Sequence, residues 1–546
     1  MSDEILRMES LQITAQAEHG GPGKKIVEDV DLILHRGEVL GLIGESGAGK
    51  STIGLAALGY TRPGCRITGG RVLFEGMNLR DASPESRRRL RGRRIAYIAQ
   101  SAAAAFNPAK TLYAQICEGP IRHGVMSLEQ ARIEAVQLFR ELDLPSPENF
   151  GERYPHQVSG GQLQRAMAAM AMSCRPDILV LDEPTTALDV TTQIEVLAAI
   201  RKLIREHRTA GLYISHDLAV VAQVANRIMV LRQGRKVEEG RADQILLQPR
   251  QEYTRALVAI REAKVARPAA STTDSKPLLE LTGVTASYAK LAHVVEGIDL
   301  SVRKGETVAV VGESGSGKST LARVITGLLP REAGEILFRG RSLEPALASR
   351  SRDLLRRIQM IYQMPDVALN PRQRVQEIIG RPLAFYQGME SAKRKERVRE
   401  LLQAIDLAPE FAHRFPGELS GGQKQRVCIA RALAAEPDLL ICDEVTSALD
   451  PLVAEGILEL LGRLQRDLGY AYIFITHDIG TVRRIADRVA VMLKGQIVAE
   501  GPLAKVFAPP YHPYTQALLS SVPEMRTDWL DGVLAERGQL GEAAAM

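Results

Sequence analysis

Two short glycine-rich stretches carry the residue types needed to hold a phosphate group. The sequence reads GESGAGKST from Gly44 to Thr52 and GESGSGKST from Gly312 to Thr320. Both fit the pattern GxxxxGK[ST], in which closely spaced glycines let backbone N–H groups wrap around phosphate oxygens. The lysine of this pattern supplies a positive charge to the outer phosphates, and the hydroxyl that follows it can ligate magnesium. The two stretches therefore predict two phosphate loops.

A pair of acidic residues follows an apolar segment in each half of the chain. ILVLDE ends at Asp182 and Glu183, and LLICDE ends at Asp443 and Glu444. Adjacent acids after a strand also occur in turns and helix caps, so the pair alone does not decide between these interpretations. Beside a phosphate loop, the first acid is expected in a magnesium shell and the second to orient or deprotonate a water. The combination predicts nucleotide hydrolysis at two sites.

Apolar runs indicate the elements that must position these residues. VLGLI (39–43) leads into the first phosphate loop, and ILVLD (178–182) leads into the first acidic pair. Continuous apolar runs of this length are typical of parallel strands buried on both faces. Ligands bind at the carboxyl ends of such strands, so the pattern predicts an α/β fold with both motifs at one edge of a sheet.

The motifs belong to a duplicated domain. VSGGQLQR contains Ser159 and LSGGQKQR contains Ser420, which gives an offset of 420 − 159 = 261. The acidic pairs share this offset, whereas the loop lysines differ by 318 − 50 = 268. A period this long indicates two whole domains rather than a solenoid. The expected division is a first domain at 1–262, a linker at 263–277, a second domain at 278–525 and a tail at 526–546.

Composition narrows the class of protein. With 546 residues the chain exceeds one hydrophobic core, since domains usually take roughly 100–200 residues. The net charge of +5 is too small to argue for nucleic acid as a partner. The five cysteines are scattered without a CxxC pattern, so neither a zinc cluster nor a disulfide framework is supported. The acidic start of the chain does not fit a signal peptide, and we expect no membrane span, since no run of about 18 apolar residues occurs.

Further motifs resemble those of the ATP-binding cassette (ABC) family. SGGQ opens an expected helix in both halves and resembles the family's signature, as do the glutamines closing IAYIAQ and IQMIYQ, the ALD segments, and a histidine after an apolar strand. The motifs occur in the family's order in both halves and cover nearly the whole chain. The resemblance implies two tandem P-loop ABC ATPase domains in the α/β class. Each would have a RecA-like core, an antiparallel β subdomain and a helical subdomain, with a short C-terminal extension.

In this family one domain supplies the phosphate loop and the other supplies the signature, so the resemblance implies two composite ATP sites with Mg²⁺. The first would use Lys50 and be completed by Ser420–Gly422, and the second would use Lys318 and be completed by Ser159–Gly161. The implied catalytic residues are Glu183, Glu444, His216, His477, Gln100 and Gln363, and the implied magnesium-binding residues are Ser51, Gln100, Asp182, Ser319, Gln363 and Asp443. The implied nucleotide-binding residues are Gly44, Glu45, Ser46, Gly47, Ala48, Gly49, Lys50, Ser51, Thr52, Ser159, Gly160, Gly161, Gln162, Tyr288, Gly312, Glu313, Ser314, Gly315, Ser316, Gly317, Lys318, Ser319, Thr320, Ser420, Gly421, Gly422 and Gln423.

Adenine recognition is expected to differ between the two halves. The family places an aromatic residue upstream of the phosphate loop to stack on the base, and Tyr288 fits this position in the second half. The first half has Ala15 there, with His19 as a substitute. Because stacking contributes roughly 1–3 kcal/mol per base, the hypothesis is that the first site binds ATP more weakly.

Segments outside the core motifs indicate a branch of the family. AFNP and ALNP follow the glutamines, and YHPYTQALLSSVP lies near the C-terminus, with QEYTRAL as its echo in the first half. These resemble the oligopeptide, dipeptide and nickel importers. The resemblance implies a peripheral ATPase on the cytoplasmic face of the plasma membrane, paired within one chain. Its partners would be two transmembrane permeases and, through them, an external substrate-binding protein, with no nucleic acid.

Alternatives remain at this stage. The cargo could be a peptide, an opine, glutathione or a metal chelate, with peptides favoured. A soluble tandem ABC protein of the translation-factor type is the main rival, although that class has a long charged linker and SHDRxFL after the histidine, where this chain has SHDLAVV and THDIGTV. A third class, a clamp that does not hydrolyse ATP, is disfavoured because both Glu183 and Glu444 are present.

Overall fold

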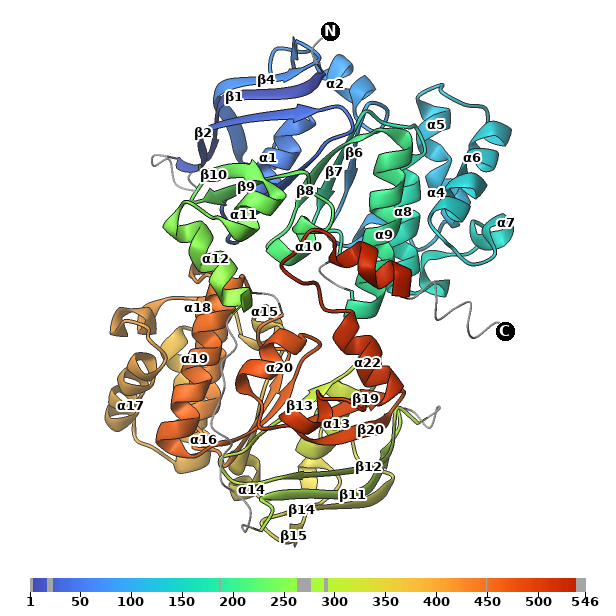
Figure 1. Ribbon diagram of the computed structural model, residues 1–546. Coiled ribbons are helices and arrows are strands. Elements are labelled where there is room, and N and C mark those ends of the chain that lie inside the picture. The colour runs from blue at the N-terminus through green and yellow to red at the C-terminus, as the bar shows by residue number, and fades with distance from the viewer. Residues whose placement is uncertain are drawn as a thin grey trace. The chain divides into compact units, whose positions relative to one another are not determined.

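The chain folds into two units in the computed structural model, which describes residues 3–16, 23–185, 188–262, 276–288, 293–447 and 449–536. The first unit comprises Met1–Glu262 together with Pro523–Met546, and the second comprises Ala263–Val522. Figure 1 shows both units. Residues 263–275 of the expected linker lie outside the described residues.

Each unit contains one antiparallel sheet and one larger, mostly parallel sheet. The strands of the first unit are β1 (Glu4–Ala15), β2 (Lys24–His35), β3 (Val39–Gly44), β4 (Cys65–Phe74), β5 (Met77–Asn78), β6 (Ile95–Ile98), β7 (Ile178–Asp182), β8 (Ala210–Ile214), β9 (Arg227–Arg232) and β10 (Arg235–Arg241). They form sheets of order β2-β1-β4-β5 and β10-β9-β3-β8-β7-β6. Strand β10 is antiparallel to β9, and the other neighbours in this sheet are parallel.

The second unit repeats this topology. Its strands are β11 (Leu279–Ala286), β12 (Val295–Val302), β13 (Thr307–Val311), β14 (Ala333–Phe338), β15 (Arg341–Ser342), β16 (Ile358–Ile361), β17 (Leu439–Asp443), β18 (Ala471–Ile475), β19 (Arg488–Leu493) and β20 (Gln496–Pro502). The sheet orders are β12-β11-β14-β15 and β16-β17-β18-β13-β19-β20. Repetition strand by strand confirms the duplicated α/β architecture expected from the sequence.

Helices pack against these sheets and form a separate helical subdomain between β6 and β7, and again between β16 and β17 (Figure 1). The first unit has α1 (Lys50–Ala57), α2 (Pro84–Leu90), α3 (Ala102–Ala105), α4 (Leu112–Ile116), α5 (Glu118–Arg122), α6 (Leu128–Glu141), α7 (Pro147–Phe150), α8 (Gly160–Met172), α9 (Val190–His207), α10 (Leu218–Ala222), α11 (Ala242–Leu247) and α12 (Glu252–Glu262). The second unit has α13 (Lys318–Thr326), α14 (Arg352–Arg357), α15 (Pro365–Ala368), α16 (Val375–Gln387), α17 (Ser391–Ala404), α18 (Gly421–Leu433), α19 (Pro451–Leu468), α20 (Ile479–Ile485), α21 (Leu503–Val506) and α22 (Pro513–Ser520).

The central strands are buried on both faces, as their composition predicts. Every residue of β3, β7 and β8 is buried, and the same holds for β13, β17 and β18. Alternation of polar and apolar residues appears instead in the antiparallel sheets, where β11 has the burial pattern of a strand with one solvated face. The core therefore lies along the parallel sheet, and loops at the carboxyl ends of its strands remain available for chemistry.

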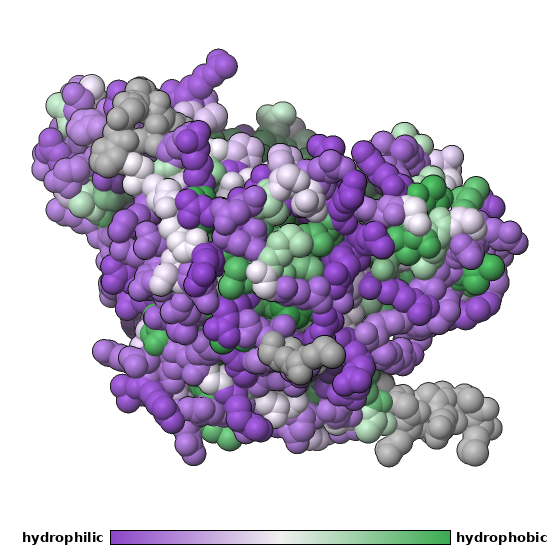
Figure 2. Space-filling view, turned by 90° about the horizontal axis from the view of Figure 1, so that it is seen from above, coloured by the Kyte–Doolittle hydropathy of each residue, from purple (hydrophilic) through white to green (hydrophobic). Residues whose placement is uncertain are grey.

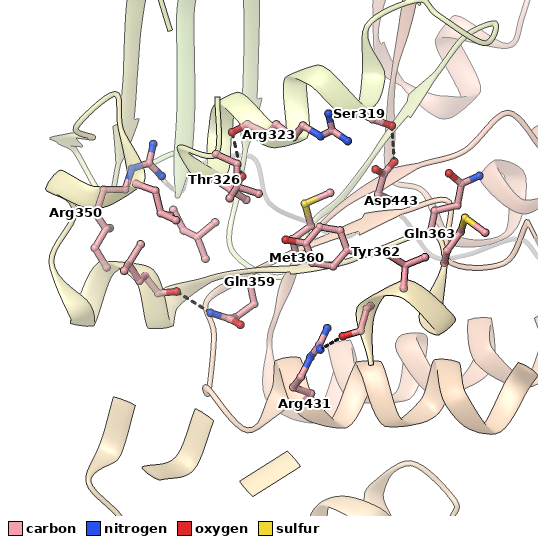
Figure 3. A pocket seen from close by; sticks show the side chains of 18 of the residues that line it. Ser319, Arg323, Thr326, Arg350, Gln359, Met360, Tyr362, Gln363, Arg431 and Asp443 are labelled. Atoms are coloured by element: carbon pink, nitrogen blue, oxygen red, sulfur yellow. Dashed lines mark hydrogen bonds between the residues drawn. The ribbon is translucent and has the colours of Figure 1, made fainter. Parts of the chain in front are cut away.

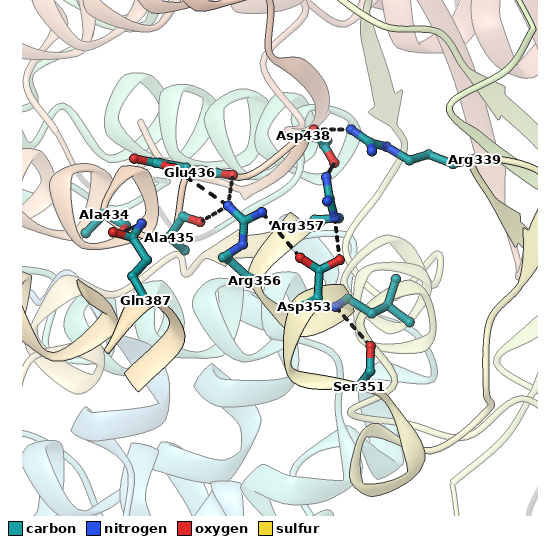
Figure 4. A network of polar contacts seen from close by, with 11 residues as sticks. Arg339, Ser351, Asp353, Arg356, Arg357, Gln387, Ala434, Ala435, Glu436 and Asp438 are labelled. Atoms are coloured by element: carbon teal, nitrogen blue, oxygen red, sulfur yellow. Dashed lines mark hydrogen bonds and ion pairs between the residues drawn. The ribbon is translucent and has the colours of Figure 1, made fainter. Parts of the chain in front are cut away.

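In both units, arginines donate hydrogen bonds to the aspartate that directly precedes the strand leading to the acidic pair, β7 or β17. In the second unit Arg339 donates to Asp438 Oδ1 at 2.6 Å and Arg357 donates to Asp438 Oδ2 at 3.1 Å (Figure 4). In the first unit Asp177 accepts hydrogen bonds from Arg36 and Arg94. Arg94 in the first unit and Arg357 in the second therefore have acidic partners within their own units.

Residues 523–536 fold as part of the first unit, whereas the sequence predicted a second domain that extends to 525 and a tail at 526–546. Gln223, at the end of α10 and only 3% exposed, donates from Nε2 to the carbonyls of Glu524 at 3.2 Å and Arg526 at 2.8 Å. The Leu530 N–H donates to Gln223 Oε1 at 3.1 Å, and Trp529 is buried. The difference arises because this anchor joins residues about three hundred positions apart, which no local sequence pattern reveals.

The surface is largely hydrophilic, with hydrophobic residues gathered in patches (Figure 2). In the first helical subdomain the exposed large hydrophobic residues include Ile121, Val125, Leu128 and Ile133. Throughout the described ranges, the helices are all too short or too polar to traverse a lipid bilayer.

Candidate functional sites

The predicted phosphate loops lie between a buried strand and a helix in both units. Gly49 has φ +93°, in the left-handed region that favours glycine, and α1 begins at the next residue. A Cβ on Gly44 would lie 2.1 Å from the Leu231 carbonyl oxygen, so only glycine fits there. Lys50 Nζ donates to the carbonyls of Gly44 at 2.6 Å and Glu45 at 2.9 Å. The loop is thus closed around its own lysine.

The second loop has the same geometry. Gly317 has φ +100° and precedes α13, and Lys318 Nζ donates to the carbonyls of Gly312 at 2.8 Å and Glu313 at 2.6 Å. Neither helix receives a side-chain cap at its first turn. The N–H groups of a helix's first turn have no partner within the helix and carry a partial positive charge. Both loops therefore offer the arrangement that binds phosphate.

A hydroxyl and a carboxylate from distant motifs meet beside each loop. Ser51 Oγ donates to Asp182 Oδ1 at 2.8 Å, and Ser319 Oγ donates to Asp443 Oδ1 at 3.0 Å. Parallel pairing explains the first meeting, because β3 and β7 both flank β8 and end at the same edge of the sheet. Burial raises the pKa of the Asp443 carboxyl more than the Ser319 hydrogen bond and nearby cations lower it.

Tyr97 is a site residue that the sequence analysis missed. Its hydroxyl donates to Asp182 Oδ2 at 2.7 Å, so both oxygens of this carboxylate are held. Tyr97 lies three residues before Gln100 on β6, and Met360 has the matching position before Gln363. The sequence does show this difference, because the third residue is tyrosine in IAYIAQ and methionine in IQMIYQ. The two sites are therefore chemically unequal at their first acid.

The second acid of each pair lies at the centre of a three-residue cluster. Gln100 Nε2 donates to Glu183 Oε2 at 2.9 Å, and His216 Nδ1 lies 3.2 Å from Glu183 Oε1. Glu183 has φ +50°, and its counterpart in the second unit has φ +48°. A non-glycine residue in this region costs free energy and is often found at functional sites. The backbone thus holds this carboxylate in an uncommon conformation that turns it toward the glutamine and the histidine.

In the cluster of the second unit, a glutamate and a histidine shift each other's pKa. Gln363 Nε2 donates to Glu444 Oε2 at 2.6 Å, and His477 Nδ1 lies 3.2 Å from Glu444 Oε1. Burial raises the pKa of Glu444, but the hydrogen bond and charge of His477 outweigh it and leave the pKa lowered. Burial lowers the pKa of His477, but the Glu444 carboxylate outweighs it and leaves the pKa raised. The carboxylate therefore stays ionised near neutral pH, as a base that activates water requires.

The predicted signatures form the first turns of α8 and α18. Ser159 Oγ accepts from Gln162 N, and Ser159 N donates to Gln162 Oε1 at 3.1 Å, which is a capping box. Ser420 and Gln423 form the same box. A Cβ on Gly161 would lie 2.1 Å from Thr192 Cγ2, so glycine permits close packing of α8 on α9. The pairing of one unit's signature with the other unit's loop stays a prediction.

Asp189 and Tyr288 complete the residues singled out by sequence. The Asp189 side chain accepts from Thr192 N at 2.9 Å and caps α9. Tyr288 has an exposed ring, and its hydroxyl accepts a hydrogen bond from Arg323 Nη1 at 2.9 Å. Ala15 ends β1, while His19 lies outside the described residues. An exposed ring tethered to the helix after the phosphate loop suits the predicted contact with a base.

Comparison with known proteins places this geometry in a family. The ABC transporter family matches residues 27–186 and 295–447. The C-terminal region of oligopeptide/dipeptide transporters matches residues 498–545. A glutathione import ATP-binding protein of Salmonella choleraesuis (strain SC-B67) is 40% identical, covering 96% of this chain and 90% of that protein. The corresponding protein of Escherichia coli (strain K12) is 39% identical, with 95% and 89% covered.

A solved dimeric ATP-binding cassette in a post-hydrolysis state with ADP and Pi is 31% identical, covering 41% of this chain and 98% of that one, with a TM-score of 0.38. Both matches to the ABC family fall on the two units that carry the phosphate loops. The importer relatives span nearly the whole chain, which rules out the translation-factor class considered from the sequence. The chain therefore belongs to the ABC transporter family, as an ATPase with two fused ATP-binding cassettes that powers an importer.

Proposed function

We propose that each ATP is enclosed by the phosphate loop of one unit and the signature of the other, and that closure and hydrolysis drive the import of short peptides. The observation that carries this proposal is the repetition of the same glutamate, histidine and glutamine cluster in both units. Two equivalent clusters support two hydrolysis sites. Because ATP would bind both halves only when they are closed, its binding shifts the population toward that state.

Magnesium fits the donor set beside each loop. Mg²⁺ is held in such sites by one or two protein oxygens together with phosphate oxygens and water. Ser51 with Asp182, and Ser319 with Asp443, supply a hydroxyl and a carboxylate within hydrogen-bonding distance of each other. Within the described ranges there is no cluster of three His, Cys, Asp or Glu residues suited to a metal ion. The bound ion would neutralise negative charge on the outer phosphates.

A cavity in the second unit supports docking of a permease. Its volume is about 750 Å³, and its lining runs from Ser319 and Asp443 past Gln363 (Figure 3). Two apolar residues in the same lining are strongly exposed, Met364 at 58% and Val367 at 80%. An exposed apolar patch beside a cavity marks an interaction surface. We place a cytoplasmic helix of a permease here, which holds the ATPase at the cytoplasmic face of the membrane and connects the partner to Gln363.

The cargo class follows from the relatives. The matched relatives are glutathione import ATP-binding proteins, and the C-terminal region matches that of oligopeptide and dipeptide transporters. Glutathione is a tripeptide, so both observations support a short peptide as cargo. The substrate would be selected by an external binding protein acting through two permeases rather than by this chain.

The test is cargo-stimulated ATP hydrolysis. The full chain is reconstituted with its two permeases in lipid vesicles, and the ATPase rate is measured with binding protein loaded with glutathione, with other tripeptides, or with a nickel chelate. Stimulation by glutathione or tripeptides is expected. Stimulation by the chelate alone would contradict the peptide assignment while leaving the motor role intact.

A pair of surface variants tests the docking site. Val367→Lys should abolish most of the stimulation by permeases and leave the basal ATPase rate of the isolated chain unchanged. Leu468→Lys is the matched control, because Leu468 is also apolar and 55% exposed but does not line the cavity. Equal loss of stimulation in both variants would contradict docking at the cavity.

A further inference from the structure

The repeated Tyr–Thr motif near the end of each unit has no role in the hydrolysis sites described above. Tyr514 lies in α22 within HPYT, and Tyr253 lies in α12 within QEYTRAL. The threonine that follows each tyrosine is almost completely buried, with Thr515 at 1% and Thr254 at 0% exposure. Such burial fixes the helical turn, and with it the direction of the preceding tyrosine. The motif therefore delivers a phenol to a defined place in each unit.

In the second unit that place is the phosphate loop. The backbone N–H of Glu313 donates to the Tyr514 hydroxyl oxygen at 2.9 Å. This N–H and the Gly312 carbonyl belong to the same peptide group, and the Gly312 carbonyl accepts from Lys318 Nζ at 2.8 Å. Because a peptide group is planar, holding its N–H also fixes the direction of its carbonyl. Tyr514 thus sets the orientation of the group that holds the loop lysine.

In the first unit the corresponding tyrosine lies beside the corresponding loop residue, but its buried hydroxyl makes no hydrogen bond to the residues that the structure describes. Burial raises the pKa of Tyr253, and the adjacent Glu45 carboxylate adds to this effect. Arg232 lies 4.8 Å from the centre of the Tyr253 ring and 3.9 Å from the Glu45 carboxylate. Glu45 occupies the second position of its loop, as Glu313 does, and the Gly44 carbonyl before it accepts from Lys50 at 2.6 Å.

We propose that Tyr514 is a positioning residue for nucleotide binding, because its hydroxyl fixes the first peptide group of the second phosphate loop. Neither tyrosine touches the cluster of glutamate, histidine and glutamine in the described contacts, so the effect falls on binding rather than on the hydrolysis step. An ordered loop presents its lysine and its N–H groups to the phosphates without first losing conformational freedom. The C-terminal extension thereby becomes a part of the ATP site.

The test compares phenylalanine variants of the full chain. Tyr514→Phe removes the hydroxyl that accepts the Glu313 N–H, and Tyr253→Phe is the matched control because it removes a hydroxyl that makes no hydrogen bond within the described part of the chain. Loss of one hydrogen bond at the second loop predicts that Tyr514→Phe raises the KM for ATP at that site by about 3- to 10-fold. The kcat should stay within about twofold, because binding is lost equally in the ground and transition states. ADP affinity should fall by the same factor, whereas adenosine affinity, measured by competition, should be unchanged because adenosine has no phosphate. Tyr253→Phe should leave both KM and kcat unchanged.

Controls separate positioning from general damage. Tyr511→Phe removes a hydroxyl three residues before Tyr514 and should leave every constant unchanged. A wild-type KM in Tyr514→Phe would overturn the proposal, as would an equal loss of ADP and adenosine affinity or the same effect from Tyr253→Phe or Tyr511→Phe. Titration of Tyr514→Phe with ADP gives a second measurement, and an unchanged affinity at the second loop would likewise overturn the proposal.

Discussion

The anchor of the C-terminal segment allows a quantitative prediction. Gln223→Leu keeps the volume of a buried side chain but removes the partner of the Leu530 N–H and of two carbonyls, those of Glu524 and Arg526. A buried polar group left without a partner costs about 1–3 kcal/mol. The Leu530 N–H is buried, while the two carbonyls can turn partly toward water. The substitution should therefore lower the free energy for local opening of the segment by about 2–4 kcal/mol. This corresponds to a change of about 30- to 1,000-fold in the opening equilibrium.

Hydrogen exchange of the Leu530 amide measures this opening directly. Gln223→Leu should accelerate exchange by the stated factor, while amides of the central strand β3 keep their protection. Asp531→Asn is the control, because it removes the ion pair between Arg201 and Asp531, and the Asp531 side chain is 62% exposed. Surface pairs contribute about 0–1 kcal/mol, so this variant should change exchange by no more than about fivefold. Equal rates in wild type and Gln223→Leu would refute the account, as would an equal effect of the two variants.

Three further predictions concern the hydrolysis sites. Glu183→Gln/Glu444→Gln should retain ATP binding but slow steady-state hydrolysis by about 10²- to 10⁴-fold, and near-normal turnover would remove both residues from catalysis. The pKa of His477 is raised in the folded protein, so its contribution to stability is complete below the unfolded-state pKa of about 6.5 and is lost as pH rises through the folded-state pKa. The difference in unfolding free energy between wild type and His477→Asn should therefore shrink as pH rises. A difference that grows with pH would contradict this prediction. Tyr97→Phe, which frees one oxygen of Asp182, should raise the Mg²⁺ concentration for half-maximal ATPase by about 10-fold, and an unchanged value would assign Tyr97 a packing role.

The motifs with fixed local spacing were the part of the fold and site that could be predicted. Each phosphate loop needs its glycines and lysine within nine residues, so the sequence alone located Lys50 and Lys318. Tyr97 could not be assigned to Asp182 in the same way, because that contact depends on the pairing of β6 with β7. The packing of Trp529 on the first unit depends on contacts with residues hundreds of positions away, for which composition offers no signal.

The backbone conformation of the second acid was likewise outside the reach of sequence patterns. Nothing in the letters DEP or DEV indicates a positive φ at Glu183 or Glu444. The conformation is held by the hydrogen bond from the backbone N–H of Glu183 to the Ile214 carbonyl at 2.9 Å and by its counterpart in the second unit. Such strain is imposed by neighbouring strands after they have paired, so it becomes visible only in the folded structure.

Site-resolved nucleotide trapping in a Gly421→Asp variant is the most direct test of composite sites. Gly421 is exposed at the start of α18, and a Cβ there would meet only Leu449, at 3.8 Å, so aspartate fits without displacing its own unit. Its carboxylate would repel the γ-phosphate that this signature is proposed to bind. In the Glu183→Gln/Glu444→Gln background, photolabelling with azido-ATP followed by peptide mapping shows which loop retains nucleotide. The account predicts loss of label at the loop of Lys50 and retention at that of Lys318; loss at Lys318 alone would contradict it.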